Sequence, residues 1–248
     1  MLENEKKKCY AIVLSAGTGS RMGSSVPKQY LPLLDRPVIY YSLKACEDSP
    51  YIDEILLVAG ADDLSYVKEE IVDKYGFTKV TAILAGGKER YFSVANALKK
   101  LEGKDGYVMI HDGARPMLTE EIIGRLYEGV RTYEAVCAAV PVKDTIKIVD
   151  EEGFAVRTPD RKTVYAVQTP QVFSLPLITG AYEELLQNPD TYRNVTVTDD
   201  AMVVECVYGK RVKMLQGTYE NIKITTPEDM EVAKVYLSKY LHQPENKH

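Results

Sequence analysis

Short runs of apolar residues recur along the first 140 positions of the chain, and segments with a different periodicity separate most of them. Within each run nearly every residue is apolar, which is typical of strands that other elements cover on both faces. We therefore predict five strands of a mostly parallel sheet, at residues 10–15, 55–59, 80–84, 107–110 and 135–140.

The segments between the first strands have apolar residues at i, i+3 and i+4, a spacing that places them on one face of a helix. They predict helices at residues 38–46, 64–75, 92–101 and 119–131. Strands that alternate with helices form βαβ units, in which helices cover both faces of a parallel sheet. The expected fold class is α/β, with a doubly wound, mostly parallel, Rossmann-like sheet.

After residue 140 the pattern changes. Residues 143–165 are polar, carry alternating Thr, Val and Ile, and include the turn sequence Glu151-Glu152-Gly153. We interpret this segment as a projecting β-arm within a single domain that spans residues 1–248. The last part of the chain predicts helices near 176–187 and 199–207, strands near 211–215 and 221–224, and a final helix from Pro227 with Thr226 as its N-cap.

The composition limits the functions open to this chain. With 248 residues, 45% of them apolar, it is large enough to fold around its own core without disulfides or a structural metal. There are 31 Lys and Arg against 36 Asp and Glu, and the resulting net charge of -5 argues against broad binding to nucleic acid or anionic membranes. Any site for a polyanion must therefore be a local cluster of basic residues.

Cysteines and histidines form no metal or redox pattern. The four cysteines lie far apart without a Cys-x-x-Cys pair, and two of the three histidines, His242 and His248, fall in the polar tail. Only His111 lies inside the predicted fold, and we expect it to be packed rather than catalytic. No stretch approaches the length of an apolar membrane span, so we expect a soluble, cytoplasmic protein.

A glycine-rich loop, Ser15-Ala16-Gly17-Thr18-Gly19-Ser20-Arg21-Met22-Gly23, follows the first predicted strand, where a parallel sheet opens its ligand crevice. Its glycines permit backbone amide N–H groups to converge on phosphate oxygens. The dinucleotide fingerprint would require glycine in place of Met22, and the Walker pattern would require Lys after Gly23, so neither NAD nor a P-loop NTPase is favoured. We predict that substrate phosphates are bound by Ser15, Ala16, Gly17 and Gly19.

Two cations accompany this loop, Arg21 within it and Lys28 directly after Pro27. Arg can fork across two oxygens of one phosphate, and Lys can place a point charge where negative charge grows as a pyrophosphate departs. Together with backbone amides, the two cations suit a triphosphate. We therefore predict that Arg21 and Lys28 are catalytic.

These residues, G-x-G-x-R-M-G followed by P-K-Q-Y, resemble the nucleotidyltransferase family that makes nucleoside diphosphate sugars and alcohols. Further motifs, in matching order from about residue 9 to 240, are similar to those of the 2-C-methyl-D-erythritol 4-phosphate cytidylyltransferases within it. They are Gly86-Gly87-Lys88-Glu89-Arg90 with Ser93, His111-Asp112-Gly113-Ala114-Arg115-Pro116, Asp144-Thr145, Asp160-Arg161, Gln168-Thr169-Pro170-Gln171, Thr198-Asp199-Asp200-Ala201 and Asn221-Ile222-Lys223. This family commonly has alanine where the chain has Ser15 and Gly113, and both replacements are small.

The resemblance implies that the nucleotide is CTP. Gly86 and Gly87 would let the flat base lie against backbone that carries no Cβ, and Arg90 and Ser93 belong to the same binding segment. Asp112, with Gly113 and Arg115 beside it, would bind substrate and would hold Mg²⁺ or another divalent cation that accompanies the triphosphate.

The acceptor implied by the resemblance is a sugar-alcohol phosphate. Arg161 of the arm and Lys223 would act as catalytic cations on its phosphate, with Thr145, Thr169 and Thr198 as hydrogen-bonding neighbours. Because the arm leaves the main domain, Arg161 would act across a subunit boundary. We therefore expect a homodimer with arm exchange at the active site, and neither nucleic acid nor membrane as a partner.

The implied reaction is attack of the acceptor's phosphate oxygen on the α-phosphate of CTP, in line with the departing pyrophosphate. A ribitol 5-phosphate cytidylyltransferase is an alternative, since it shares the first loop and the Gln-Thr-Pro-Gln and Asn-Ile-Lys segments. Asp160-Arg161 and Thr198-Asp199-Asp200-Ala201 favour the methylerythritol enzyme. A catalytically silent nucleotide-binding regulatory subunit is an alternative of another class, but it should have lost Arg21, Lys28 or Asp112.

Overall fold

A seven-stranded sheet runs through the centre of the protein, which a computed structural model describes at residues 6–17 and 26–241. In spatial order its strands are β11 (Lys213–Gln216), β7 (Ala135–Pro141), β10 (Tyr165–Ser174), β6 (Tyr107–Asp112), β1 (Cys9–Ser15), β4 (Glu54–Ala59) and β5 (Val80–Ala85). Neighbouring strands are parallel except for β10, which runs antiparallel to both β6 and β7. The predicted doubly wound, mostly parallel α/β fold is confirmed.

Helices cover both faces of this sheet, as strands that are apolar throughout require. One face packs against α1 (Val38–Asp48), α4 (Glu120–Tyr133) and the helical segment made of α2 (Leu64–Tyr66) and η4 (Val67–Asp73). The other face packs against α3 (Arg90–Lys100), α5 (Leu175–Gln187) and α6 (Asp200–Tyr208). Side chains of β1 alternate between the two layers, since Val13 joins the first and Ile12 the second.

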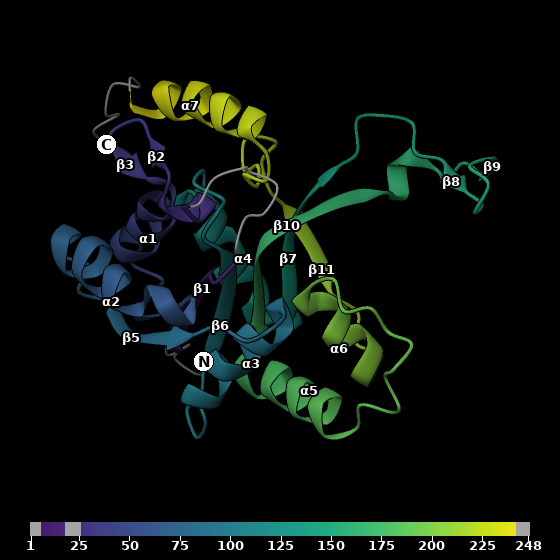
Figure 1. Cartoon of the computed structure of the whole chain (residues 1–248). Helices are drawn as coiled ribbons and strands as arrows, with labels where there is room; N and C mark the ends of the chain where they lie inside the picture. Colours follow the sequence, from purple (N-terminus) through teal and green to yellow (C-terminus); the bar gives the residue numbers. More distant parts are fainter. Residues whose placement is uncertain (1–5, 18–25, 242–248) are drawn as a thin grey trace.

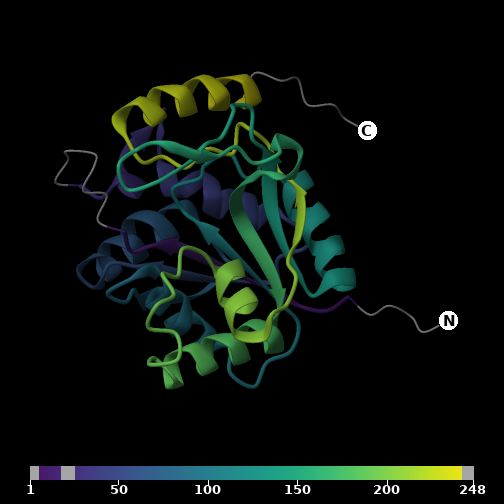
Figure 2. The same ribbon diagram turned by 90° about the vertical axis from the view of Figure 1, so that its right-hand side faces the viewer.

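A smaller apolar cluster lies under the last helix. There α7 (Pro227–Leu241) packs Ala233 and Leu237 beside Leu33 of the hairpin formed by β2 (Pro32–Leu33) and β3 (Arg36–Pro37). Figures 1 and 2 both show α7, in yellow, at the opposite end of the molecule from α5 and α6. Within the described ranges, no helix combines the length and the apolar composition that a membrane crossing needs.

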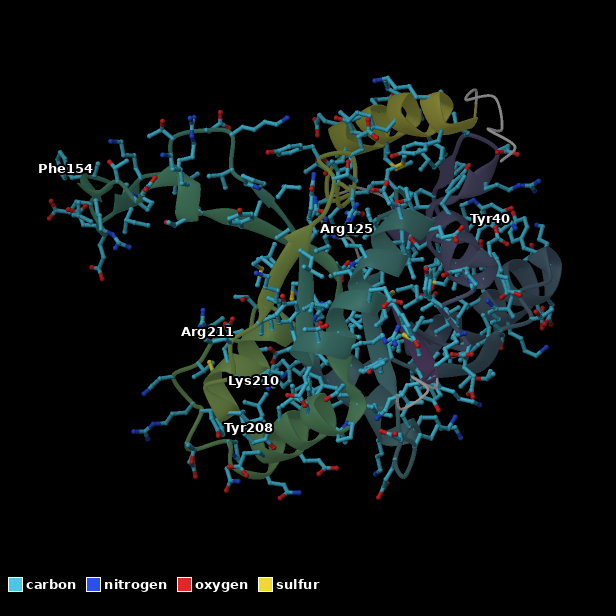
Figure 3. All side chains as sticks on the ribbon, turned by 180° about the vertical axis from the view of Figure 1, so that it is seen from behind. Tyr40, Arg125, Phe154, Tyr208, Lys210 and Arg211 are labelled. Atoms are coloured by element: carbon cyan, nitrogen blue, oxygen red, sulfur yellow. The ribbon has the colours of Figure 1, made fainter. Side chains whose placement is uncertain are left out.

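The arm expected at residues 143–165 projects from the body where β7 ends, and the chain returns along β10 (Figure 1). Inside it, β8 (Ile148–Val149) and β9 (Ala155–Arg157) form a small antiparallel hairpin, which the short helix η5 (Arg161–Thr163) follows. Figure 3 shows Phe154 at the tip of the hairpin, far from the body, and its side chain is 68% exposed. Apolar side chains of the arm are therefore exposed to solvent.

The sequence pattern does not predict β10, the longest strand of the sheet. Gln168, Thr169 and Gln171 interrupt its apolar run, and Pro170 lacks the N–H group that a central strand normally donates. The strand accommodates the proline at an irregularity, because its register with β7 shifts between Val167 and Gln171. A polar, proline-containing segment thus fills the space between two buried strands.

Two further expectations differ from the structure. The prediction of a strand at 221–224 is wrong, since these residues pair with no other strand. The Ile224 N–H nevertheless donates a hydrogen bond to the Ala114 carbonyl at 2.9 Å. The helix expected at 64–75 is mainly π-type in η4. The final helix begins at Pro227 as predicted, and Asp229 accepts hydrogen bonds there from the backbone N–H groups of Thr225 and Thr226.

The central position of β10 predicts that its buried aromatic residue is critical for stability. Phe173 is fully buried among side chains of the second layer, so we expect Phe173→Ala to lower the free energy of unfolding by about 3–5 kcal/mol. Leu186→Ala is a suitable control, because this residue of α5 is 38% exposed and should cost less than about 1 kcal/mol. Urea unfolding curves measure both values, and equal losses would contradict the central placement of β10.

Candidate active site

Three loops meet at the carboxyl edge of the parallel strands. In the register of the sheet, Ser15 at the end of β1 is opposite Ala59 of β4, and Leu14 is opposite Asp112 of β6. The Gly86 N–H donates to the Ala59 carbonyl at 2.7 Å, and the Gly113 N–H donates to the Leu14 carbonyl at 2.8 Å. The chain segments that follow β5 and β6 are therefore bonded to the ends of β4 and β1 at this edge.

A cavity of about 330 Å³ opens between these loops. Its lining includes four cations, Lys28, Lys88, Arg90 and Lys223, against the two carboxylates Glu89 and Asp112. The other lining residues are Leu14, Ser15, Ala16, Gly17, Gln29, Gly87, Ser93 and Ala114. An excess of positive charge in a chain with a net charge of -5 is the local basic cluster that a polyanion site needs.

Asp112 is the carboxylate around which the cations gather. Its oxygens lie 2.9 Å from Lys223 Nζ, 3.3 Å from Arg90 Nε and 3.7 Å from Arg115 Nε. Burial alone would raise the pKa of Asp112, but the charges of Arg90, Lys223 and Arg115 outweigh it and hold the pKa well below the usual carboxyl range. The group is therefore a permanent negative charge.

Arg90 is held from its other side by Asp200, at the start of α6. The guanidinium makes a bidentate pair with this carboxylate, at 3.0 and 2.8 Å. Asp200 is fully buried and also accepts a 2.6 Å hydrogen bond from the Tyr182 hydroxyl. Its own N–H donates to Gln171 Oε1 at 3.0 Å, so β10 fixes the start of α6. Arg90 is thereby oriented before any ligand arrives.

A buried glutamine positions the start of the glycine-rich loop. Gln29, in the short helix η2 (Lys28–Tyr30), donates from Nε2 to the carbonyls of Ser15 and Gly17, the latter at 3.0 Å. The Ser15 hydroxyl donates to the Val58 carbonyl at 2.9 Å, which ties the same turn to β4. Lys28, next to Gln29, lines the cavity, while Gly19 and Arg21 lie outside the described residues.

The two glycines after β5 are required by close packing. A Cβ at Gly86 would collide with the Ala16 side chain, and a Cβ at Gly87 would collide with Phe92. The Gly87 N–H donates to Ser93 Oγ at 3.0 Å, so the serine hydroxyl stabilises the turn as well as facing the cavity. These glycines are expected to make room for a base, and packing within the fold requires them as well.

Below the cavity, a chain of hydrogen bonds joins β6 to β10. The Asp112 N–H donates to Thr169 Oγ1 at 3.0 Å, and this hydroxyl lies 3.2 Å from His111 Nδ1. His111 Nε2 lies 3.2 Å from the Arg115 carbonyl. Burial lowers the pKa of His111 to about 4, so the imidazole is neutral, donating from Nε2 and accepting at Nδ1. His111 is packed and satisfied, as the sequence suggests.

Apart from Gly19 and Arg21, which lie outside the described residues, the predicted site residues fall into three groups. The cavity lining contains Lys28, Lys223, Asp112 and the binding residues Ser15, Ala16, Gly17, Gly87, Arg90 and Ser93. Gly86, Gly113, Thr169 and Arg115 lie directly behind that lining, and Arg115 Nη1 donates to the Asn221 carbonyl at 2.8 Å. Thr145, Arg161 and Thr198 are exposed and do not line it.

The sequence does not indicate the roles of several residues that support the site. Gln29, Gln171 and Asp200 lie inside recognised motifs, but nothing in the linear sequence indicates their partners. Tyr182 gives no signal at all, because it resembles any apolar position of α5. Each acts through a contact between segments far apart in the chain, such as the pair that joins Arg90 to Asp200.

The cavity offers few side chains that could bind a metal ion. Among the described residues, no group of three or more His, Cys, Asp or Glu is placed to hold a metal ion. Asp112 offers one carboxylate to the cavity, and both of its oxygens face cationic side chains. This composition suits an ion that takes most of its ligands from a bound phosphate chain and from water.

Comparisons with known proteins agree with this geometry. The family model described as 2-C-methyl-D-erythritol 4-phosphate cytidylyltransferase matches residues 9–239. Proteins of that name from Lachnospira eligens and Lachnoclostridium phytofermentans are 50% and 47% identical, over 92% and 94% of this chain and 98% of each relative. A crystal structure of 4-diphosphocytidyl-2C-methyl-D-erythritol synthase from Anaerococcus prevotii superposes with a TM-score of 0.81, at 35% identity over 94% of this chain and 97% of that one. The chain belongs to the 2-C-methyl-D-erythritol 4-phosphate cytidylyltransferase family.

Proposed function

We propose that the cavity at the sheet edge carries out the reaction of this family. CTP and 2-C-methyl-D-erythritol 4-phosphate combine to give 4-diphosphocytidyl-2-C-methyl-D-erythritol and pyrophosphate, a step of the methylerythritol phosphate pathway to isoprenoid precursors. The observation that carries the proposal is the excess of cations in the cavity of a chain that matches the family from residue 9 to 239. Two polyanionic substrates require such a cavity.

The chemistry needs no protein nucleophile. An oxygen of the acceptor phosphate attacks the α-phosphorus of CTP, the bond from that phosphorus to the β-phosphate oxygen breaks, and pyrophosphate leaves with the electron pair. A phosphomonoester is already largely ionised at neutral pH, so the protein has to position the two anions and neutralise charge. We assign the stabilisation of the leaving pyrophosphate to Arg21 and Lys28.

The other predicted residues would bind the rest of the nucleotide. Ser15, Ala16, Gly17 and Gly19 would present backbone to the triphosphate, and Gly86, Gly87 and Ser93 would flank cytosine. Arg90, oriented by Asp200, and Asp112 would hold the region of the ribose and α-phosphate, with Gly113 and Arg115 behind them. A divalent cation such as Mg²⁺ would neutralise charge on the triphosphate, and Asp112 would contribute a ligand to it.

The acceptor side would use Lys223 from this chain and Arg161 from an arm, with Thr145, Thr169 and Thr198 as hydrogen-bonding neighbours. Arg161 lies on the exposed arm, away from the lining of the cavity in its own chain. Several apolar side chains of the arm are exposed as well, namely Ile148, Val149, Phe154 and Val156. A homodimer that exchanges arms would bury these side chains and would bring Arg161 to the partner's cavity.

The direct test of this function is product formation. Purified protein with CTP, Mg²⁺ and 2-C-methyl-D-erythritol 4-phosphate should release pyrophosphate, measured as phosphate after added pyrophosphatase. Ribitol 5-phosphate in the same assay should give a much lower kcat/KM. A preference for ribitol 5-phosphate would support the alternative acceptor, and CTP binding without pyrophosphate release on either acceptor would support a silent subunit. The cytoplasmic location and the single-domain organisation of residues 1–248 stay predictions.

The assignment of the leaving-group cations predicts a loss of kcat. Lys28→Ala and Arg21→Ala should each lower kcat by roughly 10²–10³, because each removes a charge that meets the growing charge of the pyrophosphate. CTP binding, measured by calorimetry, should weaken far less. Lys100→Ala, an exposed lysine at the end of α3, is the control and should match the wild type. A kcat within a few-fold of wild type in both site variants would refute the assignment.

Arm exchange predicts that two inactive variants complement each other. We expect Lys28→Ala and Arg161→Ala to be nearly inactive when expressed alone. When the two are co-expressed, half of the dimers combine both chains, and each such dimer would contain one cavity with an intact Lys28 and an intact Arg161. Activity should then recover to about a quarter of the wild-type value. If Arg161 acts within its own chain, co-expression restores nothing.

A further inference from the structure

The segment between β11 and α7 contacts the root of the arm, which we define as Pro141 to Lys143. The Tyr219 hydroxyl donates to the Pro141 carbonyl at 2.8 Å, and the Lys143 ammonium lies 3.7 Å from the centre of the Tyr219 ring. Pro141 is the last residue of β7, so both contacts fall where the chain enters the arm. One side chain thus holds this root by a hydrogen bond and by a cation–π contact.

The contacts continue outward from this root into the arm. The Lys143 carbonyl accepts a 3.1 Å hydrogen bond from Arg161 Nη1. Lys143 therefore contacts Tyr219 through its ammonium and Arg161 through its backbone. A short chain of contacts links Tyr219 to the arm cation that the proposed function assigns to the acceptor phosphate.

In the other direction, the neighbours of Tyr219 are bonded to the floor of the cavity. The Thr218 carbonyl accepts from Gln168 Nε2 at 2.8 Å. Asn221 is fully buried, and its Nδ2 donates to the Thr169 carbonyl at 2.8 Å. Two residues further on, Lys223 reaches Asp112 at 2.9 Å. The backbone from which Lys223 extends is thereby fixed to β10.

We propose that Tyr219 is a positioning residue for the acceptor. It fixes the root of the arm, which would carry Arg161 to the partner's cavity, and its neighbours fix Lys223 in the cavity of its own chain. The inference rests on the proposed acceptor roles of Arg161 and Lys223. Tyr219 is 43% exposed and does not line the cavity, so it acts through its neighbours rather than by touching substrate. The loops around Lys28 and Ser93 are fixed by other contacts, so binding of CTP should not depend on Tyr219.

A second tyrosine on the surface offers a matched control. Tyr133, the last residue of α4, is 45% exposed and has the Lys213 ammonium 5.5 Å from its ring centre. It shares the exposure and the cation–π contact of Tyr219. Tyr219 donates a hydrogen bond to Pro141 at the arm root. Among the described residues, no hydrogen bond joins Tyr133 to the arm root.

Steady-state kinetics with each substrate varied in turn test the inference. Tyr219→Ala should raise the KM for 2-C-methyl-D-erythritol 4-phosphate by about tenfold, with kcat and the KM for CTP within about twofold of wild type. Tyr219→Phe keeps the ring beside Lys143 but loses the hydrogen bond to Pro141, and should recover only part of this loss. Lys143→Gln leaves the tyrosine in place and should give a smaller rise in the same constant. Tyr133→Ala should match wild type.

Several results would overturn the inference. They are an unchanged acceptor KM in Tyr219→Ala, an equal rise in both KM values, or the same shift in Tyr133→Ala, which would indicate general loosening of the surface. Lys223→Met separates this inference from the proposed function. If Lys223→Met raises the acceptor KM and Tyr219→Ala does not, only the positioning role fails. If Lys223→Met leaves the acceptor KM unchanged, the proposed role of Lys223 itself fails.

Discussion

The charge of one buried carboxylate organises the site. A cavity for two polyanions must gather cations before its substrates arrive, and those cations repel one another at the distances found here. Asp112 lies 2.9 to 3.7 Å from Lys223, Arg90 and Arg115, and so offsets part of that repulsion. Because the three cations hold its pKa low, Asp112 keeps its charge throughout the range in which the acceptor phosphate is ionised. An amide or hydroxyl at this position would leave Lys223 and Arg115 without this opposing charge, whereas Arg90 would keep its pair with Asp200.

The carboxylate and its cations depend in turn on a satisfied polar layer beneath them. Thr169 accepts from the Asp112 backbone, and Gln171 fixes the start of α6, from which Asp200 orients Arg90. Unpaired polar groups at such depth would cost several kcal/mol in total, whereas a paired network specifies one arrangement. The polar stretch of β10 thus supplies, within the sheet, the partners that the neighbouring apolar strands lack.

These long-range pairings mark the boundary of what the sequence predicts. Apolar runs and helical spacing are local properties, and they predict the parallel strands, the flanking helices and the arm to within a few residues. Lys28, and Asp112 at a strand end, can also be found, because charge at the carboxyl edge of a parallel sheet has few other uses. Lys223 is indicated only by the family motif Asn221-Ile222-Lys223. β10 is not predicted because its polar side chains pair with groups on other segments, such as Asp112 of β6 for Thr169 and Asp200 of α6 for Gln171. Tyr182 is not predicted for the same reason, because its hydroxyl contributes to the site by its hydrogen bond to Asp200.

The two substrates also draw on different parts of the fold. The proposed nucleotide contacts come from the loops after β1, β5 and β6, and backbone hydrogen bonds join the last two of these loops to the ends of β4 and β1. The proposed acceptor contacts come from the arm after β7 and from the segment after β11, on the far side of β10. The segment after β11 is held to the loop after β6 at several points, since Lys223 contacts Asp112, Arg115 donates to the Asn221 carbonyl, and the Ile224 N–H donates to the Ala114 carbonyl. The arm, by contrast, projects from the body, so under the proposed function it can vary with the acceptor while the triphosphate loops stay intact.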